Sequence, residues 1–344
     1  MEMKAAVLEK LNSPLAIDEL QVPDLDCGQV LVQVRRSGIC GAQIGEIAGV
    51  KGEDKYLPHL MGHEGGGVVL DVGPGVTKVK KDDHVVMHWR KGAGIEAKPP
   101  KYKRGQGFVG GGWITTFNEV SVVSENRLTA IPKDIPFEVA ALMGCAVTTA
   151  LGLVNNEAEL KIGQSIAVAG SGGVGLNIIQ GAAMVSANPI IAIDLFDHKL
   201  KLAQEFGATH VINAGNEDIR ESIKRIAGKF GVDVFVDCTG KVDIMGQGYE
   251  STAPNGRTIL VGQPRFEHDL VLKSMVRHFT GKILMDSQGG RTDPSIDIPR
   301  YIDLYKNGKL KLDKLITHRF SLDSVNIALD KIRNGETGRC IIEF

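Results

Sequence analysis

A glycine-rich turn in the middle of the chain has the spacing that binds a diphosphate. It reads Gly170-Ser171-Gly172-Gly173-Val174-Gly175, a GxGxxG pattern. An apolar run at 165–169 predicts a preceding strand, and residues 174–185 predict a following helix, which is the context that this motif requires. The three glycines would allow a tight turn, a close approach of backbone N–H groups to phosphate, and close packing of helix on strand. The turn therefore predicts a dinucleotide site at a helix N-terminus.

Asp194 indicates which dinucleotide binds. It ends the next apolar run, 189–193, and no arginine follows it at 195–199. A carboxylate there can accept hydrogen bonds from both ribose hydroxyls of NAD and would repel the 2′-phosphate of NADP. The sequence therefore favours NAD(H).

The five cysteines carry no obvious pattern of their own. They lie far apart and never form CxxC: Cys27, Cys40, Cys145, Cys238 and Cys340. A sparse, odd set fits a reducing compartment, where a free cysteine is most often a small buried apolar residue. The neighbours of each cysteine must therefore decide its role.

The elements that would position these groups change character along the chain. Short strand-like runs with glycine and proline punctuation fill the first half, and residues 90–112 form an irregular polar segment. From about 150, apolar strands alternate with helical stretches, which predicts a doubly wound parallel sheet of the α/β class. After about 288 the chain returns to a mixed α+β pattern and ends on a strand. A nucleotide-binding domain at 154–287, inserted into a domain formed by 1–153 and 288–344, explains this order.

Composition limits the kinds of partner. With 344 residues the chain can bury two cores, and 40 basic against 41 acidic residues give a net charge of −1. This balance favours neither nucleic acid nor an anionic membrane as a partner. No apolar run long enough to span a membrane is present, and no signal sequence is recognised at the N-terminus. We expect a soluble, cytoplasmic protein that acts on a small molecule.

Several short motifs in a fixed order carry a resemblance to a known family. They are Gly38-Ile39-Cys40-Gly41, Gly62-His63-Glu64, Gly73-Pro74-Gly75-Val76, Asp83-His84-Val85, Gly144-Cys145-Ala146-Val147-Thr148-Thr149, the glycine turn, Asp237-Cys238-Thr239-Gly240 and Gly338-Arg339. With them the chain resembles the zinc-containing medium-chain alcohol and polyol dehydrogenases over nearly its whole length. The resemblance implies a β-rich GroES-like catalytic domain around a Rossmann domain, with the active site between the two.

The resemblance also assigns residues. It implies that Cys40, His63 and Cys145 hold a catalytic zinc, with Glu64 as a fourth ligand or a neighbouring group. Two thiolates and an imidazole suit zinc and leave a position for water or a substrate oxygen. By the same pattern Thr149 and Val174 pack against the nicotinamide, Arg339 reaches the pyrophosphate, Lys199 lies near the adenosine ribose, and Trp89 lines the substrate pocket.

Three positions depart from the family pattern. Ala42 and Gly45 replace the hydroxyl and the histidine of the usual proton relay, so the path from alcohol to solvent is missing as written. Gln43 replaces an aspartate that accepts a hydrogen bond from the zinc-bound histidine, so it brings no negative charge. Glu46, Glu64, a substrate hydroxyl or water could take the proton instead.

The structural-zinc cysteines of the family are also absent, so we expect one zinc per subunit. A basic segment at 90–104 stands in their place; it could bind a substrate phosphate, or it could be solvated or lie at a subunit contact.

These features favour a dehydrogenase or reductase that transfers a hydride between NAD(H) and a polyol, a sugar derivative or another substituted secondary alcohol. Two alternatives remain: a zinc-free quinone or enoyl reductase, and a catalytically silent NAD-binding protein. The resemblance further implies a homodimer or homotetramer formed through edge strands of the nucleotide domain.

Overall fold

A computed structural model describes residues 1–273 and 275–344. The chain divides into two compact units, the first built from residues 1–148 and 293–344 and the second from residues 149–292. The predicted boundaries, at 153/154 and 287/288, each lie five residues inside the second unit. The difference arises because the segment 289–291 packs against the helical residues that follow Thr149; a side chain at Gly152, for example, would meet the Gly290 carbonyl oxygen at 2.5 Å.

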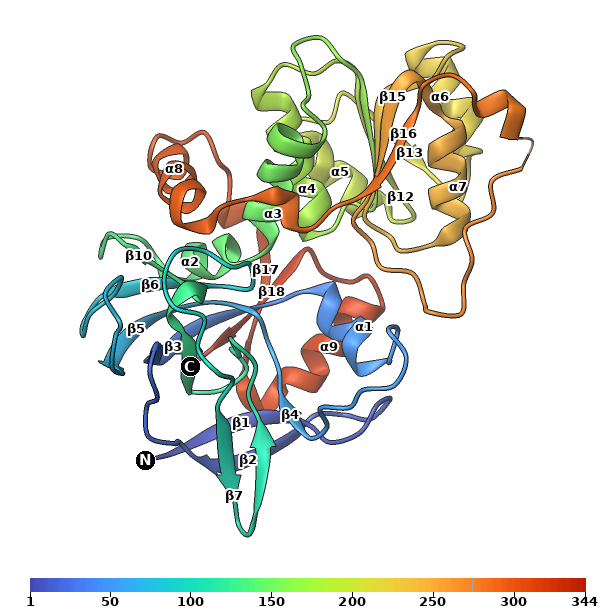
Figure 1. The fold of residues 1–344 in the computed structure, drawn as a ribbon. Helices are drawn as coiled ribbons and strands as arrows, with labels where there is room; N and C mark the ends of the chain where they lie inside the picture. The colour runs from blue at the N-terminus through green and yellow to red at the C-terminus, as the bar shows by residue number, and fades with distance from the viewer. Residues whose placement is uncertain (274) are drawn as a thin grey trace. The chain divides into compact units, whose positions relative to one another are not determined.

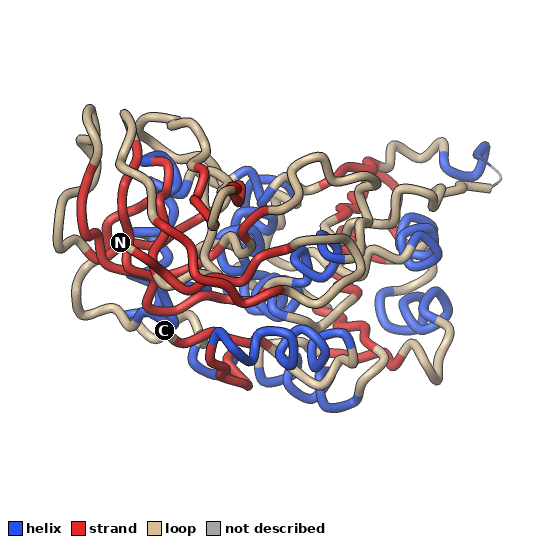
Figure 2. The backbone as a smooth tube through the Cα atoms, turned by 90° about the horizontal axis from the view of Figure 1, so that it is seen from below, coloured by secondary structure: helices blue, strands red, loops and turns tan. Residues whose placement is uncertain are grey.

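The first unit is built mainly from strands, and both chain termini belong to it (Figures 1 and 2). One set closes a barrel in the order β1-β2-β7-β8-β4, with strands β1 (Glu2–Leu8), β2 (Ala16–Gln21), β7 (Lys101–Arg104), β8 (Gly107–Gly110) and β4 (His59–Leu60). A second sheet runs β10-β6-β5-β3-β18-β17, and β9 also pairs with β3. Its strands are β10 (Leu128–Ile131), β6 (His84–His88), β5 (Glu64–Val72), β3 (Gln29–Ile39), β18 (Arg339–Glu343), β17 (Ile316–Ser321) and β9 (Val120–Ser124).

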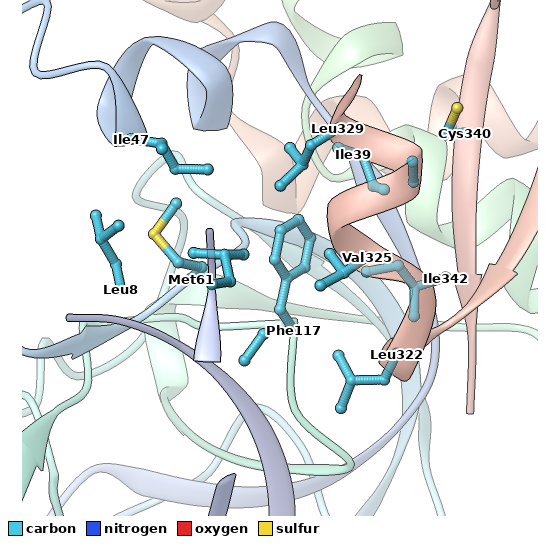
Figure 3. Packing of buried hydrophobic residues seen from close by; sticks show 13 residues of the cluster. Leu8, Ile39, Ile47, Met61, Phe117, Leu322, Val325, Leu329, Cys340 and Ile342 are labelled. Atoms are coloured by element: carbon cyan, nitrogen blue, oxygen red, sulfur yellow. The ribbon is translucent and has the colours of Figure 1, made fainter. Parts of the chain in front are cut away.

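Short helices connect these strands. They are α1 (Gly41–Ile47), α2 (Phe137–Met143), α8 (Pro294–Lys306) and α9 (Val325–Arg333), and α3 (Ala146–Gly152) spans the boundary between the units. The helix α9 packs its apolar side against β18 and the end of β3, where Val325 and Leu329 meet Ile39, Phe117 and Ile342 (Figure 3). This dry contact fixes the end of β3, from which α1 starts.

The second unit is a parallel six-stranded sheet in the order β13-β12-β11-β14-β15-β16. The strands are β11 (Ile166–Ala169), β12 (Ile190–Asp194), β13 (His210–Asn213), β14 (Val232–Asp237), β15 (Thr252–Leu260) and β16 (Ile283–Asp286). The helices α4 (Gly173–Met184) and α5 (Asp197–Glu205) lie on one face, and α6 (Ile219–Ala227) and α7 (Val242–Glu250) on the other (Figure 1). Because helices cover both faces, the central strands are almost continuously apolar, and Ala167, Ile191 and Phe235 are fully buried.

The structure confirms the α/β fold class, and it corrects one detail. The segment 90–112 is not irregular throughout, because β7 and β8 form an antiparallel hairpin within it that completes the barrel. Its lysines and glycines hide the strand pattern, since Lys101 and Lys103 point outward on β7 and two of the four residues of β8 are glycines. The buried Tyr102 and Val109 mark the inward face.

Among the described residues, no single helix is long and apolar enough to cross a membrane; the bent pair Phe137–Met143 and Ala146–Glu157 passes that test only when taken together.

Candidate metal centre and cofactor site

The register of the second sheet brings distant residues to one place in the first unit. The strand β3 ends at Ile39, just before Cys40, and Ile39 is paired with Cys340 of β18. The antiparallel partner on the other side, β5, pairs Gly65 with Ser37. The starts of β5 and β18 therefore lie beside the end of β3. This arrangement gathers Cys40, His63, Glu64 and Arg339.

Three of these side chains form a group with metal-ligand character. The ligand atoms of Cys40, His63 and Cys145 all lie within 4.8 Å of one another. Both cysteines are buried, and the Nε2 atom of His63 is buried without a hydrogen-bond partner. An orphaned ring nitrogen next to two thiols is what a bound cation would satisfy. Two sulfurs and one nitrogen are a donor set that fits zinc and leaves a fourth position open.

The surroundings favour the thiolate that zinc requires. A hydrogen bond from Cys145 holds the pKa of the Cys40 thiol well below its ordinary value, and His63 and Arg339 act in the same direction against the effect of burial. Zinc binds the deprotonated form, so this environment prepares Cys40 as a ligand.

Glu64 is not one of the three grouped ligands in the structure. Its carboxylate forms an ion pair with the Arg339 guanidinium, and both side chains are almost completely buried. The second carboxylate oxygen accepts a long hydrogen bond from the Ala146 N–H at 3.4 Å. Glycines make room for it: a Cβ atom on Gly38 would meet Oε1 of Glu64 at 2.7 Å. Glu64 therefore lies beside the metal group, as the second of its two predicted roles requires.

Arg339 has a partner that the sequence did not predict. Its guanidinium pairs with Glu64 in the first unit. The reason is the register of β18 with β3, which turns the first residue of β18 toward the metal group. A contact of Arg339 with the pyrophosphate stays a prediction.

Gln43 contacts two of the three metal-group residues. Its side chain is fully buried, and its Oε1 accepts a hydrogen bond from the Cys40 N–H at 2.8 Å. Its Nε2 lies 2.5 Å from Nδ1 of His63. Gln43 therefore touches His63, as the family pattern implies for this position, through its amide nitrogen, and its contact with Cys40 was not predicted from the sequence.

The other α1 residues offer few groups for proton transfer. Ala42 and Glu46 are exposed, and Gly45 has no side chain. Loss of water around the carboxyl, which neighbouring protein atoms partly displace although the residue stays exposed, raises the pKa of Glu46, while the charges of His59 and His63 oppose this shift. The role of Glu46 in proton transfer stays a prediction.

The residues at the end of β6 divide between core and surface. His88 is buried; one ring nitrogen lies 2.7 Å from the Arg90 carbonyl oxygen and the other 3.0 Å from the Thr129 hydroxyl. These contacts make His88 a core residue. Trp89 is half-buried. Its N–H donates a hydrogen bond to the Gly144 carbonyl oxygen, and its carbonyl oxygen accepts one from the Arg127 guanidinium. The pocket role of Trp89 stays a prediction.

The basic segment 90–104 is partly neutralised by its own surroundings. Lys91 pairs with Glu96 at 3.2 Å, and Arg104 pairs with Glu9, just after β1, and with Asp18 of β2. These ion pairs hold the segment in place and neutralise part of its positive charge. They therefore favour a structural role over the binding of a substrate phosphate.

The glycine turn of the second unit has the geometry of a dinucleotide site. A Cβ atom on Gly175 would meet the Gly170 carbonyl oxygen at 1.9 Å, so only glycine lets α4 pack so close to β11. A Cβ atom on Gly172 would meet nothing within 4 Å, which leaves the surface above the turn open. Since no side chain caps the start of α4 at Gly172, its N–H groups are free to bind an anion.

Asp194 lies beside this turn, as the motif predicts. Its carboxylate accepts hydrogen bonds from the N–H groups of Ser171 at 2.7 Å, Leu195 at 2.8 Å and Phe196 at 3.2 Å. These bonds fix the carboxylate next to the turn, where ribose hydroxyls would arrive.

The remaining cofactor candidates are also in the second unit. Lys199 lies over the Phe196 ring, with Nζ 5.1 Å from the ring centroid, on α5. Thr149 is buried, and its hydroxyl has no hydrogen-bond partner. The structure also places Val174 in the first turn of α4. Their contacts with the cofactor stay predictions.

Comparisons with known proteins agree with this site. The alcohol dehydrogenase GroES-like domain model matches residues 26–133, and the zinc-binding dehydrogenase model matches residues 173–307. The chain is 31% identical to an S-(hydroxymethyl)glutathione dehydrogenase of Paracoccus denitrificans and 31% identical to a class-3 alcohol dehydrogenase of Cereibacter sphaeroides, over the full length of each. It is similar in structure to the benzyl alcohol dehydrogenase of Acinetobacter calcoaceticus, with a TM-score of 0.88, 26% identity and coverage of 100% of this chain and 99% of that one.

The chain therefore belongs to the zinc-containing medium-chain alcohol dehydrogenase family. Fold, metal group and relatives together define a zinc-dependent dehydrogenase that acts on CH–OH groups with NAD. A Pseudomonas syringae quinone oxidoreductase, at 21% identity and a TM-score of 0.84, shares the fold only. The zinc-free alternative is thus not favoured, since the three zinc ligands lie together.

Proposed function

We propose that this enzyme interconverts a substituted secondary alcohol, such as a polyol or a sugar derivative, and its carbonyl form. The observation that carries the proposal is a contrast between the metal group and α1. The three metal-ligating side chains are present, whereas α1 lacks the hydroxyl and the imidazole of the family's usual proton relay. Cys40, His63 and Cys145 would hold one zinc, while Ala42 and Gly45 offer no transferable proton.

The chain's own residues divide the work of the reaction. A zinc ion held by the three ligands supplies Lewis-acid polarisation of the substrate oxygen. The turn around Gly172 and the carboxylate of Asp194 would hold and orient the dinucleotide, which supplies the hydride acceptor or donor when it is bound. Glu64 and Arg339 neutralise each other beside the metal group. The proton of the alcohol must leave through water, Glu46 or a hydroxyl of the substrate itself, and the last route favours a polyhydroxylated substrate.

One experiment tests both metal and substrate class. Zinc is quantified in the purified protein, and NAD-linked oxidation is measured for ethanol, polyols, sugar phosphates and S-(hydroxymethyl)glutathione, a substrate suggested by the name of one relative. We expect one zinc per chain and a higher kcat/KM with polyols than with ethanol. Equal activity on ethanol would overturn the substrate class, and full activity of a Cys40→Ala variant would overturn the metal mechanism.

We further propose that two copies of the chain pair through the second unit. The strand β16 is the last strand of its sheet, and Ile283 and Leu284 on it are 43% and 39% exposed. Other large apolar side chains nearby in the sequence are exposed as well: Phe266, Val271, Val276 and Phe279. A free strand edge with exposed apolar residues is a preferred place for pairing with a second copy.

The oligomeric state can be measured directly. Light scattering on the eluting protein should give a dimer or a tetramer, and Leu284→Lys should shift it toward the monomer, whereas Ile162→Lys, at an exposed site in the same unit, should not. A monomeric wild-type protein would overturn the pairing.

A further inference from the structure

A short helical turn, η1 (Glu125–Arg127), is held firmly inside the first unit, and its side chains are buried. Oε1 of Glu125 accepts hydrogen bonds from the N–H groups of Thr77 at 2.6 Å and Lys78 at 2.8 Å. Its Oε2 accepts one from the Ile95 N–H at 2.7 Å. Hydrogen bonds to a charged acceptor are the strong ones, so three of them fix η1 against its neighbouring loops.

The same turn holds the middle of the segment 89–97, which leaves β6 and leads toward β7. The Asn126 N–H donates a hydrogen bond to the Ile95 carbonyl oxygen at 3.2 Å, and the Asn126 carbonyl oxygen accepts one from the Gly92 N–H at 2.8 Å. Because these bonds join backbone to backbone, they set the path of the segment directly. The side chains along the segment are placed by that path.

Arg127 extends this hold to Trp89, at the start of the segment. Its Nη1 donates a hydrogen bond to the Trp89 carbonyl oxygen at 2.9 Å, and its Nη2 lies 3.5 Å from the Glu96 carboxylate. The guanidinium carbon lies 5.3 Å from the centroid of the Trp113 ring. A planar guanidinium can bond two acceptors at once in a fixed orientation. Arg127 therefore restrains the position of the Trp89 backbone.

Strand register places Trp89 beside the metal group. The residue before it, His88, pairs with Glu64, the neighbour of a metal ligand. The Trp89 N–H donates a hydrogen bond of 3.4 Å to the carbonyl oxygen of Gly144, which precedes the ligand Cys145. The Trp89 backbone thus lies next to two ligand-bearing segments. A displacement of Trp89 would change the surface beside the metal group.

We propose that Arg127 is a positioning residue that holds Trp89 in place and thereby sets which alcohols the enzyme accepts. The inference rests on the proposed function, because Trp89 would line the pocket for the alcohol. Without the guanidinium, the Trp89 carbonyl loses a partner and the residue gains freedom to move. A large alcohol, which would fill more of the pocket than a small one, should lose more affinity as a result.

The test is a double-substitution cycle, which asks whether two residues act through each other. Arg127→Met keeps the apolar stem and removes the guanidinium, and Trp89→Ala removes the pocket side chain. KM and kcat are measured for the smallest and the largest alcohol that the enzyme oxidises. We expect Arg127→Met to raise KM for the large alcohol about tenfold and to change kcat and the other KM much less. In the presence of Trp89→Ala it should add nothing.

The matched control is Arg257→Met, in the second unit. Arg257 also donates a hydrogen bond to a backbone carbonyl, that of Glu157 at 2.7 Å, and pairs with Glu159 at 2.8 Å. Its loss should leave both KM values for alcohols unchanged. Arg127→Lys keeps the charge but not the planar fork, so it should raise KM in the same direction and by less. This variant completes the cycle if Arg127→Met does not fold.

A second readout needs neither substrate nor NAD. The chain has two tryptophans, so in a Trp113→Phe background the fluorescence comes from Trp89. In that background Arg127→Met should increase quenching of Trp89 by acrylamide, and Arg257→Met should not. This change in an enzyme that oxidises no alcohol would count against the proposed function and leave the hold of Arg127 on Trp89 in place. Unchanged quenching would overturn the proposal, and so would effects of Arg127→Met and Trp89→Ala on KM that simply add.

Discussion

Arg339, the first residue of β18, forms an ion pair with Glu64, the first residue of β5, and their side chains are 5% and 0% exposed. The pair stands next to the metal group, where Arg339 also helps to lower the pKa of the Cys40 thiol. A buried pair of this kind costs solvation energy to form, but loss of one partner leaves an uncompensated charge in the interior.

This relationship predicts strongly unequal effects of single and double substitutions. Arg339→Met should lower the free energy of unfolding by about 3–5 kcal/mol, because Glu64 would stay buried and charged. The double variant Arg339→Met with Glu64→Met should recover most of that loss. Urea unfolding of the metal-free proteins measures both values. If Arg339→Met is as stable as the wild type, Arg339 and Glu64 do not form a buried ion pair.

His88 predicts a pH dependence of stability. Burial lowers the pKa of its imidazole from 6.5 to about 4. The unfolded chain therefore binds a proton near pH 6.5 while the folded one stays neutral, so this contribution to stability is complete above pH 6.5. It is lost as the pH falls toward 4, by about 3 kcal/mol in total.

The check is a series of unfolding curves between pH 7 and pH 4. His88→Asn should flatten the curve of unfolding free energy against pH in this window relative to the wild type. His198→Asn, at an exposed position on α5, serves as the control and should leave it unchanged. Identical slopes for the wild type and His88→Asn would contradict the prediction.

Two glycines of the nucleotide turn should respond differently to the same added methyl group. Gly172→Ala has open space, so the protein should keep its melting temperature but bind NADH more weakly, since the methyl group enters the surface where the pyrophosphate would lie. Gly175→Ala should lose both stability and binding, because its Cβ would meet the Gly170 carbonyl oxygen at 1.9 Å. Thermal unfolding and fluorescence titration with NADH separate the two outcomes. Equal NADH affinity for Gly172→Ala and the wild type would place the cofactor elsewhere.

Asp194 should control the choice of dinucleotide. Asp194→Ala removes the acceptor for ribose hydroxyls and the charge that repels a 2′-phosphate, so the ratio of kcat/KM for NAD to that for NADP should fall about tenfold or more. Asp197→Ala removes a carboxylate from the start of α5 and should leave the ratio unchanged. If both variants keep the wild-type ratio, the Asp194 carboxylate does not contact the ribose and does not discriminate NAD from NADP.

The sequence by itself determined the features whose residues are neighbours along the chain. The turn from Gly170 to Gly175, the strand before it and the helix after it form a local pattern, and Asp194 follows at the end of the next strand. Such a pattern depends on a tight turn and on short packing distances, which the local residue types already dictate. The metal ligands could be predicted only from the family resemblance, because Cys40, His63 and Cys145 are far apart in the sequence and form no local motif of their own.

Tertiary structure decided the rest, because it depends on strand register. The pairing of β18 with β3 turned Arg339 toward Glu64, across a separation of 275 residues that no local pattern can bridge. The double contact of Gln43 needed the start of α1 and the loop before β5 to meet. The hairpin of β7 and β8 was not predicted for a related reason: its strands are only four residues long and rich in lysine and glycine, and only closure of the barrel buries Tyr102 and Val109. Register and closure are set by the whole packed core, so they appear only once the chain has folded.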